Sequence, residues 1–201
     1  MFFSFDGVDG VGKSTQMDLF CTWLTELGHQ VVQCRDPGST RLGEALRDIV
    51  LNTKDTPINR RAEMFIYMAA RTQMVEEVIL PALERGCIVV SDRFLLSTVV
   101  YQGIAGGLDV EEVWDVGLVA TGGLRPNMTF VLDMDVDDAA RRRNREPDRM
   151  ESQGVGYLKR VRDGFLSQAA EQPDAITVID ASQSIEQVHQ AIREGAAHVL
   201  A

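Results

Sequence analysis

The segment from Gly7 to Ser14 constrains the fold of this chain more than any other part of the sequence. It reads Gly-Val-Asp-Gly-Val-Gly-Lys-Ser and satisfies the pattern GxxxxGK[ST], with an apolar run before it and an amphipathic stretch after it. Glycines permit positive φ angles, so successive backbone N–H groups can point at phosphate oxygens, and the following helix adds its dipole. We therefore expect a phosphate-binding loop between a first strand and a first helix. The alternative, a glycine-rich turn with a surface lysine, is disfavoured because both flanking patterns are present.

The rest of the chain alternates short apolar runs with longer amphipathic stretches, a pattern typical of strand-helix units that build a parallel sheet. We expect strands at Phe2 to Asp6, Gln30 to Arg35, Cys87 to Ser91, Met128 to Asp133 and Ala175 to Asp180. Helices are expected at Lys13 to Leu27, Arg41 to Leu51, Arg60 to Arg85, Val110 to Thr121, Val155 to Ala170 and Ile185 to Val199. Pro81 should kink or split the third helix, because proline removes a backbone donor. The sequence therefore predicts an α/β protein of the P-loop NTPase fold, with five parallel strands and a single domain over residues 1–201.

Composition and charge exclude several classes of protein. The formal net charge is −10, which argues against a broad nucleic-acid-binding surface, because such a surface must be basic. No apolar stretch is long enough to cross a bilayer, and the N-terminus shows no targeting pattern, so we expect a cytoplasmic protein with no membrane partner. Cys21, Cys34 and Cys87 lie far apart and form no CxxC motif. They are expected to be buried, reduced thiols without a disulfide or metal role.

A phosphate-binding loop alone does not define a reaction, because GTPases, ATPases and small-molecule kinases all carry one. The chain has no Asn-Lys-x-Asp segment of the kind that reads guanine in GTPases, and it is short for a motor or transport ATPase. These absences favour a kinase that uses ATP. Lys13 should reach the β- and γ-phosphates, and Ser14 should ligate Mg²⁺. The residues expected to contact ATP are Gly7, Val8, Asp9, Gly10, Val11, Gly12, Lys13, Ser14 and Thr15.

Four further segments combine basic, aromatic and acidic residues in a set order. They read Arg-Asp-Pro-Gly-Ser-Thr at 35–40 with Arg47 after it, Ala-Glu-Met-Phe-Ile-Tyr-Met-Ala-Ala-Arg at 62–71, Ser-Asp-Arg-Phe at 91–94, and Ser-Thr-Val-Val-Tyr-Gln-Gly at 97–103. In this order, and over nearly the whole chain, the segments resemble the thymidylate kinase family. The resemblance implies ATP and dTMP as substrates, Mg²⁺ as cofactor, and a homodimer that uses helices such as Arg60 to Arg85.

The residue types in these segments suit recognition of a nucleoside monophosphate. Arg35 and Arg47 flank a tight turn and could clamp a phosphate by paired, charge-assisted hydrogen bonds. A solvated helix start is the alternative for this pair. Tyr67 and Arg71 are one helical turn apart, so a ring that stacks on a pyrimidine and a guanidinium that donates to a ring carbonyl share one face. An aromatic residue in an apolar helix is more often part of the core, but Arg71 on the same face favours a site.

The resemblance assigns the remaining acceptor residues position by position. Arg93 would span the acceptor phosphate, and Asp92 would hold Mg²⁺, directly or through water. Thr98 and Gln102 would contact the thymine edge, and Tyr101 would lie against the sugar. Asp9 would approach the 3′-hydroxyl group, although an aspartate that only stabilises the turn is a fair alternative. The dTMP-binding residues are thus Asp9, Arg35, Arg47, Tyr67, Arg71, Arg93, Thr98, Tyr101 and Gln102. The chain departs from the family's usual residues at Tyr67, where Phe is common, and at Phe94, where Tyr is common.

An arginine-rich segment follows the fourth predicted strand. Five arginines fall within residues 141–149, and the segment resembles the family's lid, here at about residues 141–151. Some members carry a basic residue inside the phosphate loop, where this chain has Gly10, so the lid should supply the missing charge, as in the bacterial type. Arg143 and Arg145 are the predicted lid residues, followed by Arg149. The alternative is a solvated helix face with ion pairs to Asp137 and Asp138.

We therefore expect transfer of the γ-phosphoryl group of ATP to dTMP, giving dTDP and ADP for dTTP synthesis. The predicted catalytic residues are Lys13, Asp92, Arg93, Arg143, Arg145 and Asp9. The attacking phosphate oxygen is already anionic, so positioning and charge neutralisation carry the rate. Two alternatives stay open: a kinase of the same fold for dUMP, CMP or a deoxynucleoside, and a nucleotide-binding switch or scaffold without transfer.

Overall fold

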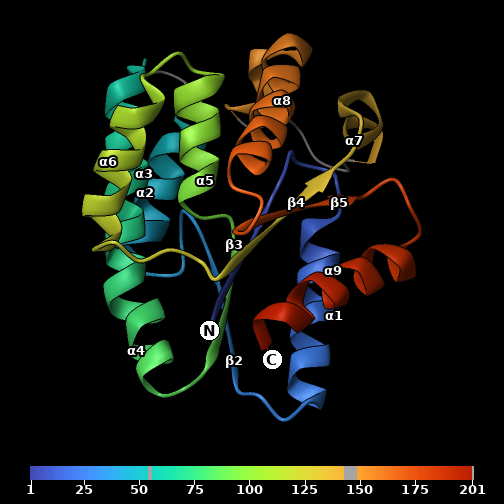
Figure 1. Cartoon of the computed structure of the whole chain (residues 1–201). Coiled ribbons are helices and arrows are strands. Elements are labelled where there is room, and N and C mark those ends of the chain that lie inside the picture. Colours follow the sequence, from blue (N-terminus) through green and yellow to red (C-terminus); the bar gives the residue numbers. More distant parts are fainter. Residues whose placement is uncertain (54–55, 143–148, 201) are drawn as a thin grey trace.

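A five-stranded sheet forms the centre of the computed structural model, which describes residues 1–53, 56–142 and 149–200 (Figure 1). All paired strands are parallel, and their order across the sheet is β2-β3-β1-β4-β5. The strands are β1 (Phe2–Asp6), β2 (Val31–Arg35), β3 (Ile88–Asp92), β4 (Met128–Asp133) and β5 (Ile176–Asp180). The predicted P-loop NTPase fold and its five strands are confirmed, with strand ends within one residue of those expected.

The six predicted helical windows are also helical. The longer helices are α1 (Lys13–Glu26), α2 (Arg41–Asn52), α3 (Arg60–Met74), α6 (Val110–Thr121), α8 (Val155–Glu171) and α9 (Ile185–Leu200). Shorter turns are η1 (Val75–Ile79), α4 (Leu80–Glu84), α5 (Leu95–Thr98), η2 (Val99–Ile104), α7 (Val136–Arg142) and η3 (Glu151–Gln153). None of the helices in the described part of the chain has the length and apolar character that a membrane span requires.

Three helical segments of the described residues were not predicted: the run α5–η2, the helix α7 and the single turn η3. The run α5–η2 consists almost entirely of buried residues, so its sequence lacks the polar face that marks an amphipathic helix. The helix α7 has seven residues, too few for a clear period, and the Asp135 side chain caps it by accepting from the Asp137 N–H at 2.9 Å.

The predicted effect of Pro81 is confirmed, because the third helical window is divided into α3, η1 and α4. The turn η1 is π-helical, and the Leu80 N–H donates to the Val75 carbonyl oxygen, five residues back. Pro81 then stands in the first turn of α4, where a missing N–H costs little. The shift to π-helical bonding thus lets the chain continue in a helical direction past the proline.

Helices cover both faces of the sheet (Figure 1). Alternation along β1 sends Phe3 and Phe5 into one cluster, with Phe20 of α1 and Ile192 of α9, and Phe2 into a second cluster with α3 and α6. All three cysteines are buried and unbridged, as predicted. Burial raises the pKa of the Cys21 thiol to about 11 and that of the Cys34 thiol to about 12, so both are protonated at neutral pH.

The carboxyl ends of β1, β2 and β3 meet at one edge of the sheet, where parallel sheets of this type bind ligands. Arg35 at the end of β2 is in register with Asp92 at the end of β3, and Asp92 with Phe5 of β1. Directly after β1, Gly7 has φ +129°, and a Cβ atom there would lie 2.4 Å from the Leu132 carbonyl oxygen. Only glycine therefore fits at the position where the phosphate loop leaves the sheet.

Candidate active site

The phosphate loop folds around the ammonium group of Lys13. The Nζ atom donates to the carbonyl oxygens of Gly7 at 3.1 Å and Val8 at 2.9 Å, and lies 3.2 Å from Asp9 Oδ1. Burial, together with the nearby charge of Arg93, lowers the pKa of Lys13 from its usual value. A bound phosphate would counter both effects, because it brings a compensating negative charge to a desolvated cation.

The nine loop residues differ in what they can offer a nucleotide. Val8 and Val11 bury their side chains in the core beneath the loop, so they can contribute only backbone groups to the nucleotide side. Gly12 has φ +97° and is the N-cap residue before α1. Ser14 and Thr15 in the first turn of α1 are exposed, which leaves their hydroxyl groups accessible.

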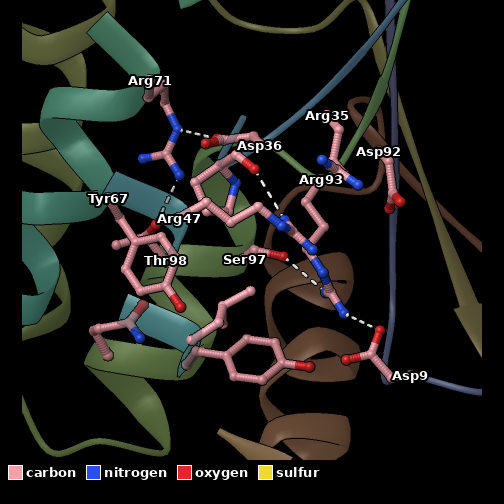
Figure 2. A pocket seen from close by; sticks show the side chains of 14 residues that line it. Asp9, Arg35, Asp36, Arg47, Tyr67, Arg71, Asp92, Arg93, Ser97 and Thr98 are labelled. Carbon is pink, nitrogen blue, oxygen red and sulfur yellow. Dashed lines mark hydrogen bonds and ion pairs between the residues drawn. The ribbon is translucent and has the colours of Figure 1, made fainter. Parts of the chain in front are cut away.

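An ion pair between Arg93 and Asp9 joins the third strand to the loop. Arg93 Nη2 lies 2.8 Å from Asp9 Oδ1, and Nη1 donates to the Gly7 carbonyl oxygen at 2.9 Å and to Ser97 Oγ at 3.1 Å (Figure 2). Burial alone would raise the pKa of Asp9, but the charges of Arg93 and Lys13 hold it well below its usual value. Asp9 is therefore ionised at neutral pH.

Arg93 has φ +69°, a left-handed conformation that is uncommon outside glycine. Its backbone is held on both sides: the N–H donates to the Phe5 carbonyl oxygen at 2.9 Å, and the carbonyl oxygen accepts from Ser91 Oγ at 2.6 Å. This backbone geometry turns the side chain from the end of β3 toward the loop, where the guanidinium also lies over the Tyr101 ring at 5.2 Å.

A cavity next to the loop brings together all nine residues predicted for the acceptor (Figure 2). They come from the loop, β2, α2, α3, the residue after β3, α5 and η2, and they are Asp9, Arg35, Arg47, Tyr67, Arg71, Arg93, Thr98, Tyr101 and Gln102. Arg35 binds both carboxylate oxygens of Glu44 at 3.1 Å, and Arg47 Nη1 donates to the Pro37 carbonyl oxygen at 2.9 Å. Both guanidinium groups are therefore oriented by the protein itself.

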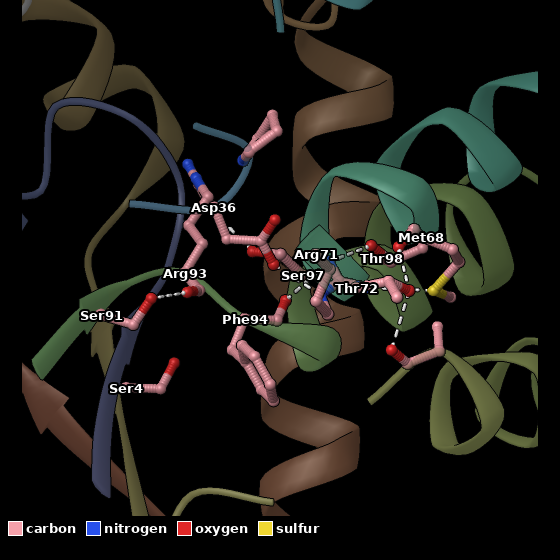
Figure 3. A network of polar contacts seen from close by, with 12 residues as sticks. Ser4, Asp36, Met68, Arg71, Thr72, Ser91, Arg93, Phe94, Ser97 and Thr98 are labelled. Atoms are coloured by element: carbon pink, nitrogen blue, oxygen red, sulfur yellow. Dashed lines mark hydrogen bonds and ion pairs between the residues drawn. The ribbon is translucent and has the colours of Figure 1, made fainter. Parts of the chain in front are cut away.

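The far end of this cavity contains a buried guanidinium. Arg71 Nε lies 2.5 Å from Asp36 Oδ2, and Nη2 donates to Thr98 Oγ1 at 2.8 Å, while each partner of the Arg71–Asp36 pair is 1% exposed (Figure 3). Burial raises the pKa of Asp36, and the Arg71 charge opposes that rise. Arg71 is thus locked in place on the same helix face as Tyr67, its neighbour one turn earlier.

A second cavity adjoins the first and includes Ser14, Arg35 and Asp92. Asp92 lines both cavities, so it lies between the loop side and the acceptor side. Its Oδ1 atom is buried and accepts no hydrogen bond from the described residues. A hydroxyl group and a carboxylate are the oxygen ligands that hard divalent cations prefer.

The arginine-rich segment is described only in part. Arg143 and Arg145 lie outside the described residues. Arg141 pairs with Asp138 one turn earlier on α7, as the solvated-helix alternative predicts. Arg142 donates to the Ala181 carbonyl oxygen, and Arg149 binds the Val50 carbonyl oxygen at 2.6 Å and the Glu63 carboxylate.

Sequence reasoning missed several residues of the site. Asp36, Pro37, Leu51 and Ser97 line the acceptor cavity without having been predicted, and Glu63 lies behind it with no exposed surface. The signal for Glu63 was available, because residues 63, 67 and 71 share one helix face. A carboxylate on the same helix face as Arg71 predicts a buried partner for it, either a cation or a polar group.

A phosphate loop with its lysine, beside a cavity that offers four arginines, two aromatic rings and buried polar groups, defines a P-loop kinase for nucleoside monophosphates.

Comparison with known proteins gives the particular family. The family model described as thymidylate kinase matches residues 5–192. A thymidylate kinase of Symbiobacterium thermophilum is 43% identical over 201 residues, covering 100% of this chain and 94% of the relative. One of Bifidobacterium longum subsp. infantis is 45% identical over 195 residues, covering 96% of this chain and 84% of the relative. The solved thymidylate kinase of Ehrlichia chaffeensis has a TM-score of 0.78 and 30% identity, and the match covers 96% of this chain and 97% of that one.

The chain belongs to the thymidylate kinase family. It is an ATP-dependent nucleoside monophosphate kinase.

The buried pair at the far end of the cavity has a measurable consequence for stability. Asp36→Ala leaves the Arg71 guanidinium buried without its carboxylate, and should lower the free energy of unfolding by about 3–5 kcal/mol. Asp138→Ala removes the exposed pair with Arg141 and should change it by about 1 kcal/mol or less. Urea denaturation of both variants measures the difference, and equal effects would contradict the role assigned to burial.

Proposed function

We propose that residues 1–201 form one kinase domain that transfers the γ-phosphoryl group of ATP to the 5′-phosphate of dTMP, giving dTDP and ADP for dTTP synthesis. The observation that carries this proposal is the shared cavity: nine residues chosen from separate sequence segments line one space that opens beside the phosphate loop. Its length is bounded by Arg93 and Asp9 near the loop and by Arg71 at the far end, which suits a phosphate at one end and a base at the other (Figure 2).

Each group has a proposed task in the transfer. Lys13 leaves the loop carbonyls to meet the β- and γ-phosphates of ATP, while Arg93, Arg35 and Arg47 bind the acceptor phosphate. The attacking oxygen of that phosphate is anionic, so no strong base is needed, and orientation with charge neutralisation lowers the barrier. Asp9 remains charged between the two sides and accepts from the 3′-hydroxyl group of the acceptor. Arg143 and Arg145 are proposed to add positive charge from the lid.

The base is proposed to lie between Tyr67 and the buried polar groups. The Tyr67 ring stacks on the pyrimidine, Arg71 and Thr98 meet its exocyclic oxygen, and Gln102 meets the ring N3 edge. Tyr101 restricts the space beside the sugar, which disfavours a ribose 2′-hydroxyl. All four contacts involve side chains that are buried at the cavity wall, where unpaired polar groups discriminate strongly between bases.

Mg²⁺ is proposed as the cofactor of ATP. Ser14 and Asp92 fit it, because they line one cavity and the Asp92 Oδ1 atom has no partner among the described residues. The described residues contain no group of three His, Cys, Asp or Glu side chains arranged for a metal, so phosphate oxygens and water would complete the coordination. When bound, Mg²⁺ would neutralise charge on the β- and γ-phosphates.

A substrate panel tests this function. With ATP and MgCl₂, ADP release should be fastest with dTMP, slower with dUMP, and low with CMP, dGMP or thymidine, and excess EDTA should abolish it. ADP release is followed in a coupled assay. Preference for a purine nucleotide or for the unphosphorylated nucleoside would overturn the assignment, and ATP binding without dTMP-dependent ADP release would favour the switch or scaffold.

The division of the site between donor and acceptor is tested by Arg93→Ala. Loss of the guanidinium removes the proposed charge-assisted hydrogen bonds to the dTMP phosphate, so the KM for dTMP should rise about tenfold or more. The KM for ATP should change about threefold or less. Arg85→Ala, which removes an exposed arginine at the end of α4, is the control and should leave both values unchanged. Equal increases in the two KM values would contradict the division.

A homodimer in the cytoplasm is also proposed, with α3 and α6 at the interface. This face exposes two large apolar side chains, Phe65 at 53% and Val119 at 84%, and Phe65 lines a surface hollow together with Met64, Leu108 and Val116. Exposed apolar surface of this kind marks an interaction site more often than a solvated face.

The oligomeric state is measured by sedimentation equilibrium. The wild-type chain should sediment as a dimer, and the double variant Phe65→Asp/Val119→Asp should sediment as a monomer, because it places charges in an apolar interface. Leu27→Asp, at an exposed position that ends α1, should stay dimeric. A monomeric wild type, or a dimer unaffected by the double variant, would refute the proposal.

A further inference from the structure

The Glu63 side chain on α3 has no exposed surface and is not part of the cavity wall, yet it touches a residue that is. Its Oε1 atom accepts from Gln102 Nε2 at 2.9 Å and from Arg60 Nη1 at 3.1 Å. Its Oε2 atom accepts from Arg149 Nη2. Both carboxylate oxygens are therefore occupied, and two guanidinium groups compensate the buried charge.

This arrangement determines which end of the Gln102 amide can meet a ligand. An ionised carboxylate accepts hydrogen bonds and cannot donate them, so the NH₂ group of Gln102 must face Glu63. Gln102 lines the acceptor cavity and is 1% exposed, and its Nε2 atom is the end of the amide that donates to Glu63. The amide atom left for a ligand in the cavity is thus the carbonyl oxygen, an acceptor.

An acceptor at this position distinguishes two pyrimidines. Thymine and uracil carry a hydrogen at N3, which a carbonyl oxygen can accept, whereas the N3 of cytosine is itself an acceptor and would face the carbonyl oxygen with no hydrogen between them. Binding that leaves a buried acceptor without a donor carries a free-energy penalty, and this penalty is larger than that of losing one hydrogen bond in water.

We propose that Glu63 is a positioning residue for base selection: it fixes the Gln102 amide with its carbonyl oxygen toward the pyrimidine, and so excludes cytosine nucleotides. The inference rests on the proposed function and adds to it the group that decides the amide's orientation. Arg149 has a part in this, because it binds the carboxylate oxygen that Gln102 does not use, while its Nε donates to the Val50 carbonyl oxygen at 2.6 Å. The stretch that ends the arginine-rich segment is thereby attached to the same carboxylate that orients the base-reading amide.

The variant Glu63→Met tests the proposal, because it keeps the length of the side chain and removes the acceptor. The Gln102 amide can then turn either end to the base. The ratio of kcat/KM for dTMP to that for dCMP should fall about tenfold or more, while the KM for ATP stays within about twofold of wild type. Dissociation constants for dTMP and dCMP, measured by calorimetry, should show the same loss of preference.

The matched control is Glu194→Gln. Glu194 accepts from the Gln190 amide at 2.8 Å on the surface of α9, so this variant weakens a similar glutamine–glutamate contact away from the cavity. It should leave the dTMP to dCMP ratio unchanged. A lower dTMP to dCMP ratio in this control would show that the loss of preference does not depend on the contact with Gln102, and it would overturn the inference.

A second variant gives an independent test should Glu63→Met not fold. Glu63→Gln/Gln102→Glu exchanges the two side chains, so the amide at position 63 can donate to a carboxylate at position 102, and an acceptor again faces the base. Preference for dTMP over dCMP should return to within about threefold of wild type. Loss of preference in this double variant would overturn the inference.

The wild-type chain separates the two levels of the argument. A wild type without preference for dTMP over dCMP would overturn the proposed function and this inference with it. A selective wild type with an unchanged ratio in Glu63→Met would overturn the inference alone.

Discussion

The contact between Arg93 and Asp9 is the interaction on which the rest of the site depends. It links the residue that follows β3 to the loop after β1, and these two strands are neighbours in the sheet. Because Arg93 also donates to the Gly7 carbonyl oxygen and to Ser97, one guanidinium connects the phosphate loop, the strand and α5. Arg93 adopts a strained, left-handed backbone conformation to make these contacts. A substrate phosphate entering between these groups would meet cations whose positions are already set.

An acidic protein that binds two anionic nucleotides needs positive charge at the binding site even though its net charge is negative. The chain has 30 acidic and 20 basic residues, yet the cavity wall carries four arginines. Each is restrained by an acceptor: Asp36 for Arg71, Asp9 for Arg93, Glu44 for Arg35, and the Pro37 carbonyl oxygen for Arg47. Desolvated cations attract phosphate strongly over a short range.

How far the sequence predicts this structure depends on the type of signal. The loop at Gly7 to Ser14 and the five strands were predictable, because a fixed motif and short apolar runs each report local chemistry. The acceptor residues were predictable from the family resemblance, and the structure brings all nine around one cavity. Asp36 and Glu63 were missed because their roles come from pairs 35 and 39 residues away in sequence, with Arg71 and Gln102. Likewise α5 and η2 were missed because burial on all sides removes the periodic pattern that identifies a helix.

The helix α3 carries Glu63, Tyr67 and Arg71 at successive turns of one face. In the proposed function, the carboxylate that orients the amide, the ring that stacks on the base and the guanidinium that donates to it therefore all lie on one helix, and Phe65 between them is 53% exposed. A substitution that rotates or shifts this helix would move all three together. A change in the position of α3 would then alter the base preference through all three residues at once, so their contacts could not be adjusted one at a time.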